Sequence, residues 1–154
     1  CGDSNSLKLI NGYMKEVKLI TLTGMEVKNM PKVLIIDDSS VMRKIIQRNI
    51  QQSGLLVDEF VEAGDGREGL EKATSNNIDL ILCDWNMPNM TGIDFVKALR
   101  SSGQKNNIPI VMVTTEGGET KIEEAKNSGA NGYLTKPFTP EQLKSKLGNF
   151  LLVK

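Results

Sequence analysis

The chain has 154 residues, with 19 basic side chains, 19 acidic side chains and no histidine. This length is typical of one domain with a sizeable core, and the balanced charge argues against a nucleic-acid or anionic-membrane partner. The sequence contains no repeat, no low-complexity run and no apolar stretch long enough to span a membrane. Its two cysteines, Cys1 and Cys83, lie far apart, which fits a cytoplasmic protein.

Residues 1–30 do not share the pattern of the rest, and we expect them to form a leader separate from a domain at residues 31–154. Asn11 and Gly12 form a turn signal between alternating apolar and polar residues, which is typical of a hairpin. A leader that is disordered, or that was added to the natural chain, is the alternative. Met30, immediately before the first expected strand, would be a plausible natural start.

From residue 31 onward, short β-rich apolar runs alternate with helical patterns. The expected strands lie at 32–36, 57–63, 78–83, 108–114 and 132–135. The expected helices lie within 39–54, 67–76, 91–103, 119–129 and 139–153. Five strand–helix units whose strands are apolar on both faces predict an α/β fold with a doubly wound, five-stranded parallel sheet covered by helices on both sides.

The ends of the first and last helices carry recognisable signals. Four apolar residues of the first helix recur at helical spacing and are expected to lie on one side of it: Val41, Ile45, Ile46 and Ile50. Ser39 or Ser40 is expected as its N-cap, and Gly54 as its C-cap. The last helix is predicted to begin after the N-cap Thr139, with Gln142 completing a capping box.

Polar side chains follow four of the five predicted strands at the point where each strand ends. They are Asp37 and Asp38 after the first strand, Asp84 after the third, Thr114 and Glu116 at the fourth, and Lys136 after the fifth. Each has an ordinary explanation when taken alone, because acids cap helices and threonine favours strands. Parallel sheets, however, bind ligands beyond the carboxyl ends of their strands, so these side chains are expected to share one site.

Three crowded carboxylates repel one another unless a cation compensates their charge. A hard divalent cation such as Mg²⁺, with Lys136 as a fixed positive charge, would resolve this repulsion. Mg²⁺ held by aspartates commonly accompanies a phosphoryl group, and a carboxylate can itself accept that group. The sequence therefore predicts Asp84 as a nucleophile for phosphoryl transfer, with Lys136 and the Thr114 hydroxyl placed to stabilise the transferred group.

Four segments resemble the receiver domain of bacterial two-component response regulators: "LIIDDSSVMRK", "CDWNMPNMTGIDFVKALR", "IPIVMVTTEG" and "GANGYLTKPFTPEQL". The resemblance covers residues 32–152, and within the family it is strongest to single-domain chemotaxis regulators. It implies a flavodoxin-like (βα)5 fold. The segment at 54–66 is longer than the family pattern leads us to expect, and Ser39 replaces a residue that is commonly bulkier.

The resemblance also assigns roles at the acidic site. It implies that Asp84 is the phosphoacceptor and that the Mg²⁺ ligands are Asp38, Asp84 and the main-chain carbonyl of Asn86. Asp37 would act on the metal mainly through water. Lys136 would contact the phosphoryl oxygens.

Further residues match positions that control the response to phosphorylation. Thr114 would hydrogen-bond a phosphoryl oxygen after transfer, and Tyr133 matches the switch aromatic. Asn86 and Glu116 stand at the positions that tune dephosphorylation. The bond that precedes Pro137 is often cis in the family.

The resemblance implies a signalling protein that catalyses only its own phosphorylation and dephosphorylation. Because the chain has no histidine, the phosphoryl group would come from the phosphohistidine of another protein, a sensor histidine kinase, or from a small-molecule phosphodonor. The expected output target is a flagellar motor switch protein or another protein, reached through the fourth helix, fifth strand and fifth helix, and a phosphatase could act on the phosphorylated form. A monomer that binds neither nucleic acid nor membrane is expected.

A receiver that acts alone in a phosphorelay outside chemotaxis fits the same residues. A haloacid dehalogenase-type phosphohydrolase would need an acid two residues after the nucleophile, where Asn86 stands. A DNA-binding regulator is disfavoured because the last predicted helix leaves no room for a helix-turn-helix domain, and the full acid, hydroxyl and lysine set disfavours an inactive receiver.

Overall fold

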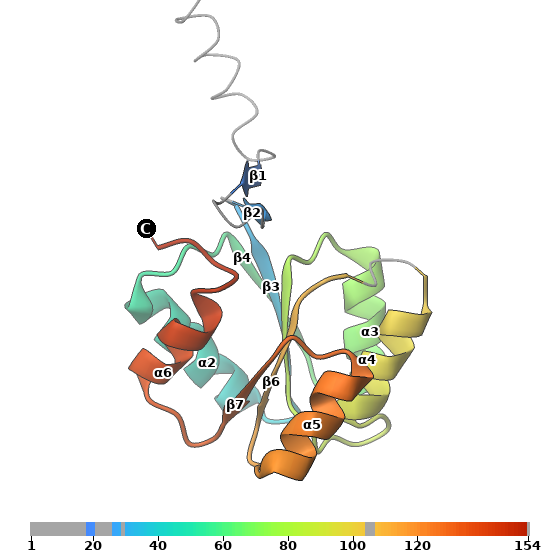
Figure 1. The fold of residues 1–154 in the computed structure, drawn as a ribbon. Coiled ribbons are helices and arrows are strands. Elements are labelled where there is room, and N and C mark those ends of the chain that lie inside the picture. Colours follow the sequence, from blue (N-terminus) through green and yellow to red (C-terminus); the bar gives the residue numbers. More distant parts are fainter. Residues whose placement is uncertain (1–17, 21–25, 29, 104–106, 154) are drawn as a thin grey trace, which may run out of the picture.

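The computed structural model describes residues 18–20, 26–28, 30–103 and 107–153 and contains a five-stranded parallel sheet between two layers of helices (Figure 1). The strands are β3 (Lys32–Ile36), β4 (Glu59–Ala63), β5 (Leu80–Cys83), β6 (Ile110–Thr114) and β7 (Gly132–Thr135). The helices are α2 (Ser40–Ser53), α3 (Gly66–Ser75), α4 (Gly92–Ser101), α5 (Glu119–Ser128) and α6 (Pro140–Leu147). The predicted doubly wound α/β fold is confirmed.

The order of the strands determines where a ligand can approach the sheet. The order is β4-β3-β5-β6-β7, so the chain moves outward from β3 to β4 and then returns to the other side of β3 at β5. Helices α2 and α6 cover one face, while α3, α4 and α5 cover the other (Figure 1). The crossovers therefore diverge between β3 and β5, where sheets of this kind have an open crevice at their carboxyl edge.

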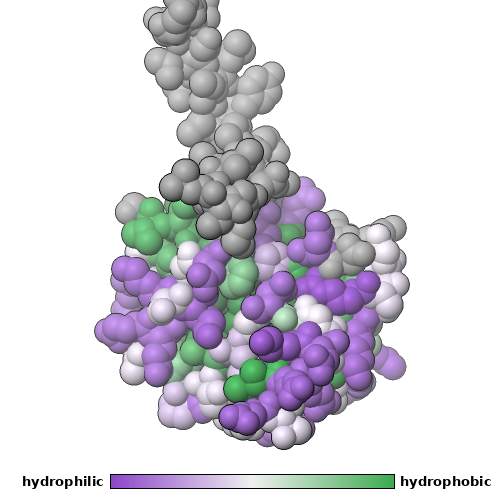
Figure 2. Space-filling view, in the orientation of Figure 1, coloured by the Kyte–Doolittle hydropathy of each residue, from purple (hydrophilic) through white to green (hydrophobic). Residues whose placement is uncertain are grey.

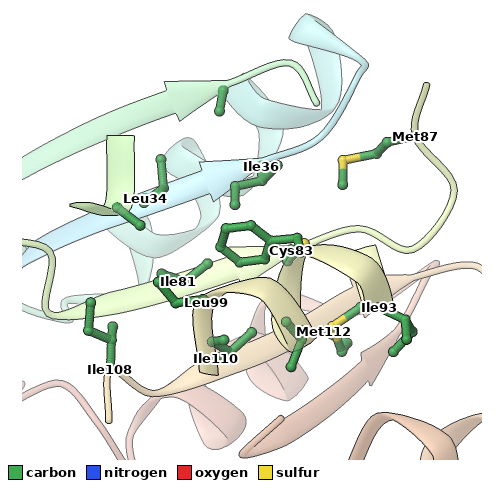
Figure 3. Close-up of a cluster of buried hydrophobic side chains, with 14 of the residues drawn as sticks. Leu34, Ile36, Ile81, Cys83, Met87, Ile93, Leu99, Ile108, Ile110 and Met112 are labelled. Atoms are coloured by element: carbon green, nitrogen blue, oxygen red, sulfur yellow. The ribbon is translucent and has the colours of Figure 1, made fainter. Parts of the chain in front are cut away.

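Successive residues of the central strands face opposite helical layers. Leu34 and Ile36 of β3 point into the cluster under α3, α4 and α5, whereas Val33 and Ile35 point toward α2 and α6. Figure 3 shows the first cluster, in which side chains of β3, β5 and β6 pack against Ile93 and Leu99. Because both faces are covered, the strands are apolar at nearly every position.

Helix α2 begins after the N-cap Ser39, whose hydroxyl accepts a hydrogen bond from the main chain of Met42. Gly54 caps its end with a left-handed φ of 84°, as expected. Ile46 is buried, together with Ile50 at the next turn.

The prediction that Val41 and Ile45 share one side of α2 with Ile46 and Ile50 is wrong. Their exposed fractions are 67% and 41%. The buried stripe instead joins Met42, Ile46 and Ile50 at a spacing of four, and the two exposed side chains lie one position earlier, about 100° around the helix.

Helix α6 is shorter than the sequence pattern indicated. The N-cap Thr139 and the capping box with Gln142 are confirmed. The helix ends at Leu147, however, and the chain then turns, buries Leu151 and forms a β-bridge to Leu55 through Val153. Apolar residues predicted to continue the helix therefore close the end of the core instead.

Two short strands precede the sheet: β1 (Lys18–Ile20) pairs antiparallel with β2 (Glu26–Lys28) beyond one end of β3 (Figure 1). The predicted turn at Asn11 and Gly12 lies outside the described residues, and the domain boundary at residue 30 stays a prediction. Within the described ranges, no helix is both long and apolar enough to cross a bilayer. Figure 2 shows a mainly hydrophilic surface over α5.

Candidate functional site

The sheet register brings the predicted polar residues to one edge. Ile36 pairs with Cys83, so the residues that follow them, Asp37 and Asp84, emerge side by side from β3 and β5. The Asp84 main-chain N–H donates to the Ile36 carbonyl at 2.9 Å. At the other end of the crevice, the Lys136 N–H donates to the carbonyl of Thr114 at 2.8 Å.

Three aspartates form a cluster in the crevice. One carboxylate oxygen from each of Asp37, Asp38 and Asp84 lies within 4.8 Å of the other two. Asp37 is 1% exposed and Asp84 is 9% exposed, whereas Asp38 lies in the open mouth of the site. Oxygen donors at this spacing are the ligands that Mg²⁺ prefers, so the cluster fits that cation.

Lys136 reaches across the site from the end of β7. Its Nζ lies 2.7 Å from Asp37 Oδ2 and 3.5 Å from Asp84 Oδ2, and its side chain is only 10% exposed. The peptide bond between Lys136 and Pro137 is cis, as the resemblance implied. One ammonium cannot neutralise three carboxylates, and the remaining negative charge favours a divalent cation.

The electrostatic environment of Asp84 makes its carboxylate more basic than usual. Burial raises the pKa of Asp84, and this effect outweighs the opposing effects of the Lys136 charge and the Thr114 hydroxyl. The Trp85 main-chain N–H donates to Asp84 Oδ1 at 2.7 Å. A carboxylate that is held in place and has a raised pKa is suited to act as a nucleophile.

The start of α4 packs directly on the end of β5. A Cβ atom at Gly92 would lie 2.0 Å from the carbonyl oxygen of Asp84, and the Gly92 N–H donates to the Trp85 carbonyl at 2.8 Å. Only glycine permits this approach, so Gly92 helps to fix the position of Asp84. We did not single out Gly92 from the sequence, although a glycine directly after the cap Thr91 was a usable signal.

The two residues predicted to tune dephosphorylation contact each other at the mouth of the site. Asn86 Nδ2 donates to Glu116 Oε2 at 3.2 Å. The other oxygen of Glu116 lies 3.9 Å from Lys121 Nζ, which itself lies 4.6 Å from the centroid of the Trp85 ring. Lys121 was not predicted, because nothing in its helical pattern distinguishes it from an ordinary surface lysine.

The two residues predicted as the switch both contact the segment that carries Glu116. Thr114 is fully buried, and its hydroxyl accepts a hydrogen bond from the Glu116 N–H at 3.2 Å. The hydroxyl of the half-buried Tyr133 donates to the Glu116 carbonyl at 2.6 Å. Burial of the ring raises the pKa of Tyr133 to about 12, so this hydroxyl remains a donor at neutral pH.

A second charged group lies beside the site, between α2 and β4. Arg43 Nε donates to Glu62 Oε1 at 2.8 Å, and Lys44 Nζ donates to Glu62 Oε2 at 2.8 Å. The Lys44 hydrogen bond, followed by that of Arg43, lowers the pKa of Glu62 to about 2. The sequence analysis missed this group, although basic residues near a helix N-terminus oppose the helix dipole and so indicate a specific partner.

Residues 33–148 match the model of the response regulator receiver domain family. Chemotaxis protein CheY1 of Helicobacter pylori is 44% identical over 117 residues, which cover 75% of this chain and 93% of that protein. A CheY homolog of Campylobacter jejuni is 42% identical over 121 residues, which cover 78% of this chain and 92% of that protein.

The solved structures agree with the sequence relatives. CheY4 of Vibrio cholerae superposes with a TM-score of 0.71 at 45% identity, covering 79% of this chain and 99% of that one. A receiver domain from a Francisella response regulator gives a TM-score of 0.65 at 34% identity, covering 73% of this chain and 89% of that one. The chain therefore belongs to the response regulator receiver domain family.

Proposed function

We propose that the protein receives a phosphoryl group on Asp84 from a sensor histidine kinase and transmits the signal through protein contacts. The observation that carries this proposal is the crevice in which Asp84 lies within 4.8 Å of two further aspartates and 3.5 Å from Lys136. The family match and the buried, basic Asp84 carboxylate support it. We infer that the protein catalyses only its own phosphorylation and dephosphorylation.

The transfer needs a nucleophile and positive charge around it. An Asp84 carboxylate oxygen attacks the phosphorus of a phosphohistidine, the O–P bond forms, and the P–N bond breaks with the electron pair returning to the imidazole. Lys136 offsets negative charge on the phosphoryl oxygens, and the Thr114 hydroxyl binds one of them after transfer. Asp38, Asp84 and the main-chain carbonyl of Asn86 would hold Mg²⁺, with Asp37 acting mainly through water, and the ion would supply the remaining positive charge.

Loss of the phosphoryl group is proposed to be controlled by Asn86 and Glu116. Their hydrogen bond places two polar side chains at the mouth of the site, where an attacking water has to pass. The phosphorylated form is therefore expected to hydrolyse unaided, and a separate phosphatase could accelerate the reaction.

The output is proposed to run from Thr114 to Tyr133. Both contact the segment at Glu116, so a movement of Thr114 toward the phosphoryl group changes the space beside the ring. Coupling of this kind is typically ~1–3 kcal/mol, or roughly 5- to 150-fold in partner affinity. The names of the relatives favour chemotaxis over a phosphorelay outside chemotaxis. We propose that the protein acts as a cytoplasmic monomer and that its target is a flagellar motor switch protein.

The site assignment is tested by incubation with acetyl phosphate and Mg²⁺, followed by intact-protein mass spectrometry. Wild type is expected to gain one phosphoryl group, and Asp84→Asn none, because an amide is a far poorer nucleophile. Asp94→Asn, which changes an exposed aspartate in the first turn of α4, is the matched control and should label normally. Equal labelling of Asp84→Asn would place the acceptor elsewhere.

The output is tested by the affinity for the motor switch protein, measured with and without beryllofluoride. This reagent mimics the phosphoryl group, and Thr114→Ala should remove most of the gain in affinity that it produces. A full gain in the variant would show that the signal takes another route, and no gain in wild type would favour a target outside chemotaxis.

A further inference from the structure

The peptide unit that joins Asp37 to Asp38 is held by a side chain from α2. Arg43 Nη1 donates to the Asp37 carbonyl at 2.5 Å, while its Nε donates to Glu62. The Asp37 carbonyl belongs to the same rigid plane as the amide nitrogen of Asp38. Arg43 therefore fixes the orientation of the plane from which Asp38 projects.

The other groups of Asp37 are already occupied. Its N–H donates to the Ala63 carbonyl at 3.0 Å, and its two carboxylate oxygens accept from the Ser39 N–H and from Lys136 Nζ. Asp38 differs, because its side chain makes no hydrogen bond within the described part of the chain, and it lies exposed at the mouth. The direction of the preceding peptide plane is thus the main local restraint on the Asp38 carboxylate.

The chemistry of Arg43 suits this task. A guanidinium is planar and donates in fixed directions, so it can hold a carboxylate and a carbonyl at the same time. Its side chain is only 17% exposed and is braced on β4 by Glu62. Lys44 contacts the other oxygen of Glu62 but is 64% exposed and makes no contact with Asp37.

We propose that Arg43 is a positioning residue for the cation site, which orients Asp38 through the Asp37–Asp38 peptide. This inference rests on the Mg²⁺ site of the proposed function. Groups that orient metal ligands from outside typically change metal affinity by ~10- to 100-fold when they are altered, and a single main-chain contact belongs at the low end of this range.

The charge of Arg43 and its positioning role predict opposite changes in Mg²⁺ affinity when Arg43 is replaced, which makes the proposal testable. Removal of a positive charge near three carboxylates should strengthen the binding of a cation. Weaker Mg²⁺ binding after loss of Arg43 therefore cannot come from its charge and has to come from geometry.

The experiment is a titration with Mg²⁺ alone, followed by Trp85 fluorescence and by calorimetry, on wild type and three variants. Arg43→Met is expected to weaken Mg²⁺ binding about 10-fold. Arg43→Lys keeps the charge but cannot donate to Glu62 and to the Asp37 carbonyl in the same fixed directions. It is therefore also expected to weaken Mg²⁺ binding. Lys44→Met removes the same charge from the same carboxylate and should leave affinity unchanged or tighten it about twofold.

The variants separate a loss of folding, a loss of positioning and the absence of a Mg²⁺ site. Thermal unfolding of Arg43→Lys checks that α2 still packs, because lysine suits a helix as well as arginine does. Affinity equal to wild type in both Arg43 variants, or equal weakening in Lys44→Met, would overturn the positioning role. Failure of wild type to bind Mg²⁺ would instead overturn the proposed function and this inference together.

Discussion

Two carboxylates on either side of β3, Glu62 in β4 and Asp84 at the end of β5, lie in opposite electrostatic environments. Glu62, on the edge strand β4, contacts two cations at 2.8 Å each, and they lower its pKa to about 2. Asp84, at the centre of the sheet, is more buried and shares one lysine with Asp37, and burial raises its pKa. Full charge compensation marks a carboxylate that stabilises the fold, and incomplete compensation marks one that is left reactive.

The largest expected effect comes from moving Asp84. Gly92→Ala places a methyl group 2.0 Å from the Asp84 carbonyl, and this atom is main chain that cannot rotate away. We expect a loss of about 3 kcal/mol in the free energy of unfolding and weaker labelling by acetyl phosphate. Chemical denaturation measures the first and mass spectrometry the second.

The matched control is Gly117→Ala, whose new Cβ would meet only Thr135 at 3.8 Å, an ordinary contact. It should change the free energy of unfolding by less than about 1 kcal/mol. Equal stability of the two alanine variants would show that the start of α4 can shift and that Gly92 does not fix the strand end.

The second prediction concerns the charge of Asp84 itself. Asp84→Asn removes a carboxylate whose ionised form is disfavoured by burial and by Asp37, and it keeps the shape of the side chain. We expect the free energy of unfolding to increase at neutral pH while phosphorylation is lost. A decrease, measured by urea denaturation, would mean that Lys136 compensates Asp84 as fully as Glu62 is compensated.

The third prediction is that replacing Glu62 lowers the free energy of unfolding, whereas replacing Asp84 raises it. Glu62→Gln removes the partner of Arg43 and Lys44 and leaves the phosphoacceptor intact. Because these pairs are partly exposed to solvent, we expect a loss of about 0.5–1 kcal/mol in the free energy of unfolding. An increase in stability would remove the contrast between the two carboxylates.

The smallest expected effect is the pH dependence of the differences in stability between wild type and the Asp84→Asn and Glu62→Gln variants. The lowered pKa of Glu62 means that its contribution is present above its ordinary pKa of 4.5 and is lost as the pH falls through about 2. The raised pKa of Asp84 gives the reverse: its neutral form contributes stability below its ordinary pKa of 3.8, and this contribution is lost as the pH rises through the folded pKa.

Urea denaturation of wild type and both variants at several pH values in the acid range measures these contributions. The advantage of wild type over Glu62→Gln should shrink toward low pH, and the advantage of Asp84→Asn over wild type should also shrink. A constant difference in either case would show that ionisation is not its cause.

The sequence predicted the strand–helix units, which depend on the spacing of apolar residues, and the shared edge of the site residues, which depends on the direction of the strands. Five strand–helix units could be recognised from apolar runs and caps, and parallel strands necessarily bring Asp37, Asp84 and Lys136 to one edge. The roles assigned to these residues stay predictions, although their proximity is now visible. The hydrogen bond between Asn86 and Glu116 also joins two residues that were predicted to share one role.

The sequence did not predict features set by the packing of distant segments. Val41 and Ile45 have the same apolar character as Ile46, and the packing of α2 against the sheet and α6 decides which stripe of α2 is buried. Gly92 and Arg43 matter through main-chain atoms of Asp84 and Asp37, and no sequence spacing encodes such contacts.

The contact between Lys136 and Asp37 has a consequence for the synthesis of the protein. The two residues are 99 positions apart, and they join the first and last strands of the five-stranded sheet. A ribosome therefore completes most of the domain before the ammonium that accompanies the acidic cluster exists. A growing chain therefore lacks this charge until the residue after β7 has been added.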